Sequence, residues 1–215
     1  MTGVIRKAAL LAVIGLVAAV SVATAGIPSP ANSTVPVYID LVGCSISGVV
    51  DPLGSFTVTV LDIGNFPVVN QLVSVAFNTD VKIFGAFPGF ASCQVAEATT
   101  NLSGVATFAA IPGGGKGGAF TGASAATIYA GSVGGIVLGT AHVTTLDENG
   151  AVSTKGVDIT DLGAWVTDYN ARAVLPLMRR SDFNHSGAVE ITDLGKWFTV
   201  YNSLLSKYSC GTLCP

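Results

Sequence analysis

The segment from residue 182 to residue 193, DFNHSGAVEITD, places oxygen-bearing side chains at short and regular intervals. A hard cation such as Ca²⁺ binds several oxygens, most of them anionic, which a single bent loop can gather. Gly187 stands near the middle, where such a loop must turn sharply. The segment therefore predicts a calcium site, and the alternative is an acidic loop that only meets solvent. The predicted ligands are Asp182, Asn184, Ser186, the backbone carbonyl of Ala188, Glu190 and Asp193.

The loop runs into a segment that the chain contains twice. Residues 157–170, VDITDLGAWVTDYN, return as residues 189–202, VEITDLGKWFTVYN, 32 positions later. Similarity of this extent indicates an internal duplication. In each copy, apolar residues recur at steps of three and four, which predicts one helix per copy. Trp165 and Trp197 take matched places on that apolar stripe, so we expect them to pack between the two helices rather than to stack on a ligand.

Loop, helix and duplication together resemble the dockerin-type module, which is EF-hand-like and binds calcium. The segment DFNHSGAVEITDL is similar to the dockerin pattern, which has Asp at position 1, Asn at 3, Gly at 6 and Asp at 12. The resemblance covers residues 147–205. It implies a small helical domain that Ca²⁺ orders and that docks onto a cohesin-like or cell-surface partner.

The first unit departs from this pattern. Counting back from Asp161 by the spacing of the second loop reaches Gly150, Val152 and Thr154, which bring no charge. A loop longer by three residues restores two ligands. The set is then Asp147, Asn149, Asp158 and Asp161. We predict that this first site is weak, distorted or empty.

The dockerin resemblance also implies a partner surface at positions 10, 11, 17 and 18 of each unit. The matched Ile-Thr pairs at positions 10 and 11 would permit docking in two orientations related by a two-fold axis. Position 17 of the second unit is Phe198, which could instead be buried and so reduce the surface. The expected surface comprises Ile159, Thr160, Val166 and Thr167 in the first unit, and Ile191, Thr192, Phe198 and Thr199 in the second.

From residue 35 to residue 146 the chain has the pattern of short strands. FTVTVLD (56–62) and LVSVAF (72–77) alternate apolar and polar residues, and glycine-rich turns separate further strands. These features predict an antiparallel β-sandwich. The motifs DIGNFPV (62–68) and TNLSGVAT (100–107) resemble the bacterial immunoglobulin-like modules of invasin-type surface proteins. The expected fold is thus mainly β, an antiparallel Ig-like β-sandwich followed by the small α-helical dockerin-like module.

Residues 1–25 have the layout of a secretory signal peptide. Arg6 and Lys7 precede an apolar run over residues 8–22, and residues 23–25 form an A-x-A cleavage site. We expect cleavage after Ala25 and a protein that is secreted, either extracellular or at the cell surface. The alternative is an uncleaved membrane anchor.

Cysteine usage fits an exported chain, in which thiols are expected to be oxidised. Sequence position favours one disulfide between Cys44 and Cys93, and another between Cys210 and Cys214 in a tail of residues 206–215. Free thiols are the alternative.

Charge and acid placement argue against several function classes. The formal net charge is −3 and no basic stripe is present, which argues against a nucleic-acid partner. Glycoside hydrolysis needs two carboxylates that face each other across a cleft. The acids of the β half form no pair with supporting context: Asp40, Asp51, Asp62, Asp80 and Glu97.

We therefore expect a non-catalytic attachment protein, with no catalytic residues. The alternative is a carbohydrate-binding module, or an accessory component of a polysaccharide-degrading system. In that case aromatic side chains would stack on sugars. The candidates are Phe84, Phe87, Phe90 and Tyr129.

Overall fold

The computed structural model describes residues 26–45, 47, 49–78, 81–83, 90–92, 94–109, 111–115, 125–147, 156–171 and 181–206. The signal peptide predicted over residues 1–25 lies outside them. Within these stretches no helix is both long and apolar enough to cross a membrane. The elements are β1 (Tyr38–Val42), η1 (Pro52–Gly54), β2 (Phe56–Thr59), β3 (Leu72–Phe77), β4 (Val81–Ile83), β5 (Phe90–Ser92), β6 (Val95–Thr99), β7 (Val105–Phe108), β8 (Ile111–Gly115), β9 (Ala125–Ala130), β10 (Ile136–Thr145), α2 (Ile159–Ala171) and α3 (Asp193–Asn202).

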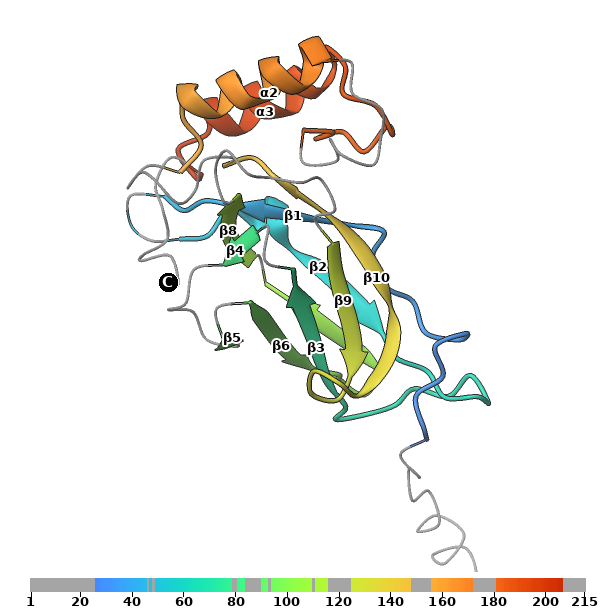
Figure 1. Cartoon of the computed structure of the whole chain (residues 1–215). Coiled ribbons are helices and arrows are strands. Elements are labelled where there is room, and N and C mark those ends of the chain that lie inside the picture. Colours follow the sequence, from blue (N-terminus) through green and yellow to red (C-terminus); the bar gives the residue numbers. More distant parts are fainter. Residues whose placement is uncertain are drawn as a thin grey trace, which may run out of the picture.

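The described part of the chain is mainly β, as the sequence predicted. Eight strands form one curled sheet in the order β4-β8-β1-β10-β9-β3-β6-β5, and β2 pairs with β7 in a second, antiparallel sheet (Figure 1). The large sheet is mixed, because β1 runs parallel to both β10 and β8. In the register of β1 with β10, Tyr38 lies opposite His142 and Asp40 opposite Thr144.

The mixed sheet differs from the wholly antiparallel arrangement that the sequence predicted. Alternation of apolar and polar residues marks a strand and its buried face, and it carries no record of the neighbouring strand's direction. β1 reaches its parallel neighbours only through long intervening segments, which a parallel pair requires.

The two sheets of the β-domain, residues 35–146, share one hydrophobic core. Val58 on β2 and Ala106 on β7 belong to the same buried cluster as Val75, Ile128 and Val143 on the large sheet. Burial follows the alternation in the sequence, since every second residue of β9 is buried. The small sheet therefore covers one face of the large one.

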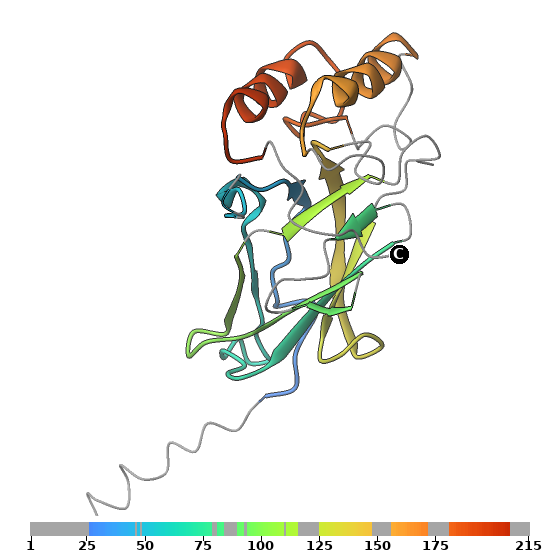
Figure 2. The same ribbon diagram turned by 90° about the vertical axis from the view of Figure 1, so that its left-hand side faces the viewer.

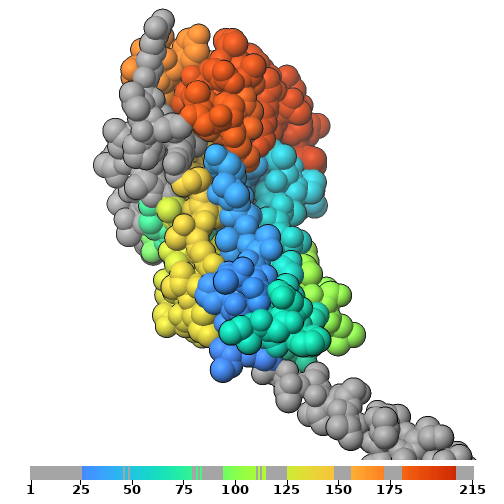
Figure 3. Space-filling view, turned by 90° about the vertical axis from the view of Figure 1, so that its right-hand side faces the viewer, coloured from blue at the N-terminus to red at the C-terminus, as the bar shows by residue number. Residues whose placement is uncertain are grey.

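A second hydrophobic core joins the β-domain to the helical unit, which comprises the described residues 156–171 and 181–206. Val42 at the end of β1 and Leu146 after β10 are buried together with residues of both helices and of the loop before α3. Figures 1 and 2 show α2 and α3 over one end of the β-domain, and Figure 3 shows the orange-red residues lying directly on blue and cyan ones. The residues that the helical unit contributes to this core are Val157, Trp165, Phe183, Trp197 and Val200.

Both tryptophans of the repeat pack in this second core, which confirms their predicted structural role. The indole ring of Trp165 stacks on Tyr169, with ring centroids 4.9 Å apart, and that of Trp197 stacks on Tyr201 at 4.7 Å. The duplication in the sequence is thus also a duplication of packing. The domain boundary predicted at residue 147 falls inside this shared core.

Trp197→Ala tests the second core. Removing this fully buried indole should lower the free energy of unfolding by about 3–5 kcal/mol. The matched control is Phe198→Ala at the next position, where the ring is 46% exposed and the loss should be about 1 kcal/mol or less. Urea unfolding of both variants measures the difference. Equal losses would contradict the proposed packing.

Candidate metal centre

The loop before α3 has the sharp bend that its glycine predicted. Gly187 has a φ of 93° and His185 a φ of 61°, so both lie in the left-handed region. The His185 N–H donates to the Asp182 carbonyl, which closes the first turn of the loop. Phe183 is fully buried in the second core and anchors the loop to the body of the protein.

Asp182 lies at the centre of this bend. Its carboxylate is buried, and it accepts N–H bonds from Ser186 at 2.9 Å (Oδ1) and from Gly187 at 2.8 Å (Oδ2). The Ser186 N–H also donates to Asn184 Oδ1 at 2.9 Å. Backbone N–H groups of the loop therefore hold the carboxylate of Asp182, the first predicted ligand, in place.

Asp193, the last predicted ligand and the first residue of α3, is also buried. Its Oδ1 accepts the Asn184 N–H at 2.9 Å and its Oδ2 accepts the Glu190 N–H at 2.7 Å. Burial raises the pKa of Asp193, these two backbone donors oppose the rise, and the negative charges of Asp182 and Glu190 add to it. The negative charges of Asp182 and Glu190 thus both act on the Asp193 carboxyl.

The remaining predicted ligands belong to the same hydrogen-bonded loop. Thr192 Oγ1 donates to Glu190 Oε1 at 2.9 Å and receives a bond from Asn184 Nδ2 at 2.7 Å. Hydrogen bonds from Thr192, Ser186 and Asn184 lower the pKa of the exposed Glu190 carboxyl. Ser186 Oγ lies 3.3 Å from the Ala188 carbonyl oxygen. These residues are thus connected by hydrogen bonds within the one loop.

The donor set of this loop fits a hard cation. Carboxylates, an amide, a hydroxyl and a backbone carbonyl are the oxygen ligands that Ca²⁺ takes, whereas structural zinc sites are built from Cys sulfur and His nitrogen. Within the described residues, no group of three or more His, Cys, Asp or Glu side chains is arranged to hold a metal ion. In the second loop the buried carboxylate oxygens of Asp182 and Asp193 accept hydrogen bonds from backbone N–H groups. Half of the six predicted metal ligands are neutral oxygens.

The first loop repeats part of this geometry. The Asp158 N–H donates to Asp161 Oδ2 at 2.7 Å, as the Glu190 N–H does to Asp193 Oδ2. Asp161 is fully buried, and Asp147 is buried as well. Asn149 lies outside the described residues. The C-terminal half of the first loop therefore matches that of the second, and the weak first site stays a prediction.

No protein-family model, curated protein or solved structure matches the chain.

The predicted partner surface is exposed in both units. Ile159 is 62% exposed and Ile191, its counterpart 32 residues later, is 61% exposed. Val166 and Phe198 form a second matched pair, at 40% and 46%. Phe198 is therefore not buried. The threonines of the predicted surface, Thr160, Thr167, Thr192 and Thr199, are exposed as well.

Cys44 is buried and disulfide-bonded, so it is not a free thiol. Cys93, Cys210 and Cys214 lie outside the described residues, and the predicted pairing stays a prediction.

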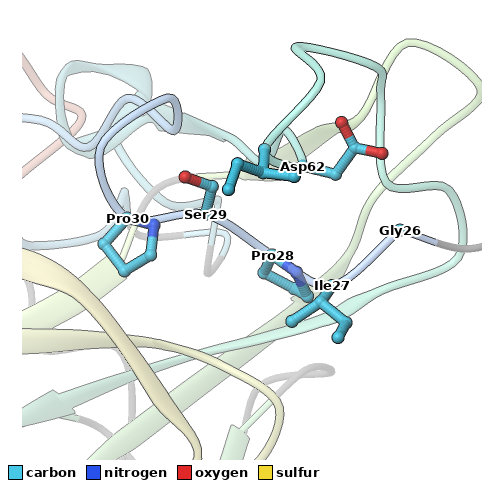
Figure 4. Close-up of a pocket in the computed structure, with 7 residues that line it drawn as sticks. Gly26, Ile27, Pro28, Ser29, Pro30 and Asp62 are labelled. Carbon is cyan, nitrogen blue, oxygen red and sulfur yellow. The ribbon is translucent and has the colours of Figure 1, made fainter.

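The described acids of the β half make hydrogen bonds within the fold or line a cavity. Asp51 accepts bonds from the Leu53 N–H and Ser206 Oγ, and Glu97 accepts one from Ser74 Oγ. Asp62 lines a cavity of about 480 Å³ at the end of the β-domain away from the helices, where its neighbours are mainly apolar (Figure 4). The residues that line it are Gly26, Ile27, Pro28, Ser29, Pro30, Asp62 and Ile63. Asp80 lies outside the described residues.

The sugar-stacking candidates are largely untested by the structure. Phe84 and Phe87 lie outside the described residues, as does the side chain of Phe90. Tyr129 is half-buried on β9.

One cluster next to the second loop was not predicted from the sequence. Asp40 on β1 contacts His185 and Lys196, which follow it by 145 and 156 residues. Residues so far apart in the sequence form no local spacing pattern from which this cluster could have been predicted.

The proposed calcium site is tested by thermal unfolding of chelator-stripped protein. Ca²⁺ at 100 times its Kd should stabilise the folded state by about 2.7 kcal/mol, and so raise Tm by roughly 5–10 °C. Asp193→Ala should abolish this increment, because the buried anion is lost. Asp62→Ala, at the far end of the β-domain, should lower Tm and keep the increment. An increment that survives in Asp193→Ala would contradict this site.

Proposed function

We propose that the protein is a non-catalytic attachment protein whose C-terminal, dockerin-like unit is ordered by Ca²⁺ and docks onto a cohesin-like or cell-surface partner. One observation carries this proposal. In the second copy of the duplicated loop–helix unit, backbone N–H groups of the loop before α3 hold two buried carboxylates, Asp182 and Asp193, around a glycine bend. The signal peptide predicted over residues 1–25 would fit such a role outside the cell.

The cation would be held by Asp182, Asn184, Ser186, the Ala188 carbonyl, Glu190 and Asp193. It would supply positive charge beside the buried Asp193, which lies near the negative charges of Asp182 and Glu190. Asp193 is also the first residue of α3, so the geometry of the loop sets the start and direction of that helix. The loop therefore controls how α3 presents its exposed side chains.

The docking surface would consist of the matched apolar pairs. Ile159 is the first residue of α2, and Ile191 lies two residues before α3. Val166 and Phe198 each follow about two helical turns later. Their similar exposure in both units supports docking in two orientations related by a two-fold axis. Isolated apolar side chains are common on protein surfaces, and a matched set on a duplicated unit favours a binding role.

The residues 35–146 would serve as an Ig-like β-sandwich that carries the docking unit. Two sheets that share one core support this assignment. The sandwich architecture hosts many functions, so we assign it no ligand.

Docking is tested by surface plasmon resonance on immobilised cohesins and on cell envelopes of the producing organism. Binding should occur in CaCl₂ and disappear in EGTA, because Ca²⁺ orders the docking unit. Replacing Ile159, Ile191 and Phe198 together by serine should weaken binding at least tenfold. The control is Leu102→Ser, an exposed leucine on the β-domain. The proposal fails if neither surface shows calcium-dependent binding, or if the triple variant binds like the control.

A further inference from the structure

Asp40 connects the β-sheet to both the calcium loop and the helix that follows it. Its Oδ1 lies 2.9 Å from His185 Nε2 and also accepts a hydrogen bond from Thr144 Oγ1 on β10. Its Oδ2 lies 2.9 Å from Lys196 Nζ on α3. The Asp40 side chain is only 12% exposed. A single carboxylate thus contacts the loop, the helix and the neighbouring strand.

His185 is held on a second side by an aromatic ring. The ring of Tyr38, also on β1, stacks on the imidazole with centroids 4.2 Å apart and planes 5° apart. His185 stands between the predicted ligands Asn184 and Ser186, and its backbone is in the left-handed region. That conformation is unfavourable for a non-glycine residue, and the contacts with Tyr38 and Asp40 hold His185 in it.

The Asp40 carboxylate is an anion in spite of its burial. Burial alone would raise its pKa. The hydrogen bond with His185, the positive charge of Lys196 and the bond from Thr144 lower the pKa by more, so that the net direction is down. A buried charge with several donors is costly to disrupt, because removing one partner leaves the others without compensation.

This cluster belongs to the second unit alone. In the first unit Lys196 is matched by Ala164. His185 is matched by Ser153 at the 32-residue spacing, or by Gly150 in the longer loop that starts at Asp147, so the first unit supplies neither an imidazole nor an ammonium group at these positions. The cluster is therefore an addition to the duplicated pattern, placed where the better-formed loop meets the sheet.

We propose that Asp40 is a positioning residue for the calcium loop, so that Ca²⁺ affinity at the C-terminal site depends on a carboxylate of the β-sheet. The inference rests on the proposed calcium site. Asp40 holds His185 and Lys196, and thereby presets the loop segment that carries Asn184 and Ser186 and the helix that begins at Asp193. Coupling between two sites is reciprocal, so Ca²⁺ binding also strengthens the attachment of the loop and α3 to β1.

The test is calorimetric titration of CaCl₂ into the full chain and its variants. Asp40→Asn keeps the shape of the side chain and removes its charge, and the Kd for Ca²⁺ should rise about tenfold or more, as for other residues that support metal ligands. Lys196→Met should raise the Kd in the same direction, and Lys196→Arg should restore it towards the wild-type value. The matched control is Asp62→Asn, whose side chain holds a turn of the β-domain through the Gly64 and Phe66 N–H groups. Its Kd should not change, even where its Tm falls.

The outcomes separate the two proposals. If wild-type protein binds no Ca²⁺, the proposed calcium site is wrong. If the wild type binds and both Asp40→Asn and Lys196→Met retain its Kd, only the positioning role of Asp40 is overturned. Should Asp40→Asn not fold, the Lys196 variants decide the question.

Hydrogen exchange supplies an independent readout of the reciprocal effect. Ca²⁺ should slow exchange of the β1 amides in the wild type and have a smaller effect in Lys196→Met, because the link from α3 to Asp40 is lost. Equal slowing in both proteins would overturn the coupling.

Discussion

The C-terminal part of the described chain depends on two carboxylates of like charge, Asp182 and Asp193, buried at the two ends of one loop. Water cannot solvate them there, so four backbone N–H groups of the loop do so instead. This requirement explains the bend at Gly187, which turns its own N–H and that of Ser186 towards Asp182. Asp193 is also the first residue of α3, where the helix dipole favours a carboxylate. Asp193 is also buried beside the negative charges of Asp182 and Glu190, which a bound cation would offset.

The loop cannot change shape independently of the rest of the protein. Phe183 sits between Asp182 and Asn184 in the chain and is fully buried in the core shared by both helices and the ends of β1 and β10. Opening the loop would expose this ring and break the contact between His185 and Asp40. At the other end of α3, Ser206 Oγ donates to the buried Asp51 and the Ser206 carbonyl accepts the Val157 N–H. The helical unit is thus attached to the β-domain at several points, which would keep the two matched apolar pairs in a fixed position relative to the sheet.

Local patterns predicted the local structure. Alternation of apolar and polar residues predicted the strand Leu72–Phe77. The repeat predicted the two helices, Ile159–Ala171 and Asp193–Asn202, and their buried tryptophans. The ligand spacing of the second loop could be recognised because all six residues lie within twelve positions and the backbone bend is local.

The directions of the strands could not be predicted, because β1 is parallel to β10 across about a hundred intervening residues. The cluster around Asp40 was hidden for the same reason, since its partners come together only when the sheet and the helical unit pack. The duplication covers only part of the first loop. Its second half has the Asp158–Asp161 hydrogen bond, but its first half lacks the ligand spacing of the second loop.

Calorimetric counting of calcium sites tests the central claim most directly. Chelator-stripped wild-type protein, Asp182→Ala and Asp161→Ala would be titrated with CaCl₂ under the same conditions. The buried anions of the second loop predict a strong site that is present in the wild type, retained in Asp161→Ala and lost in Asp182→Ala. No binding heat in the wild type, or a site unaffected by Asp182→Ala, would contradict the account and leave the C-terminal repeat as a helical pair without a metal.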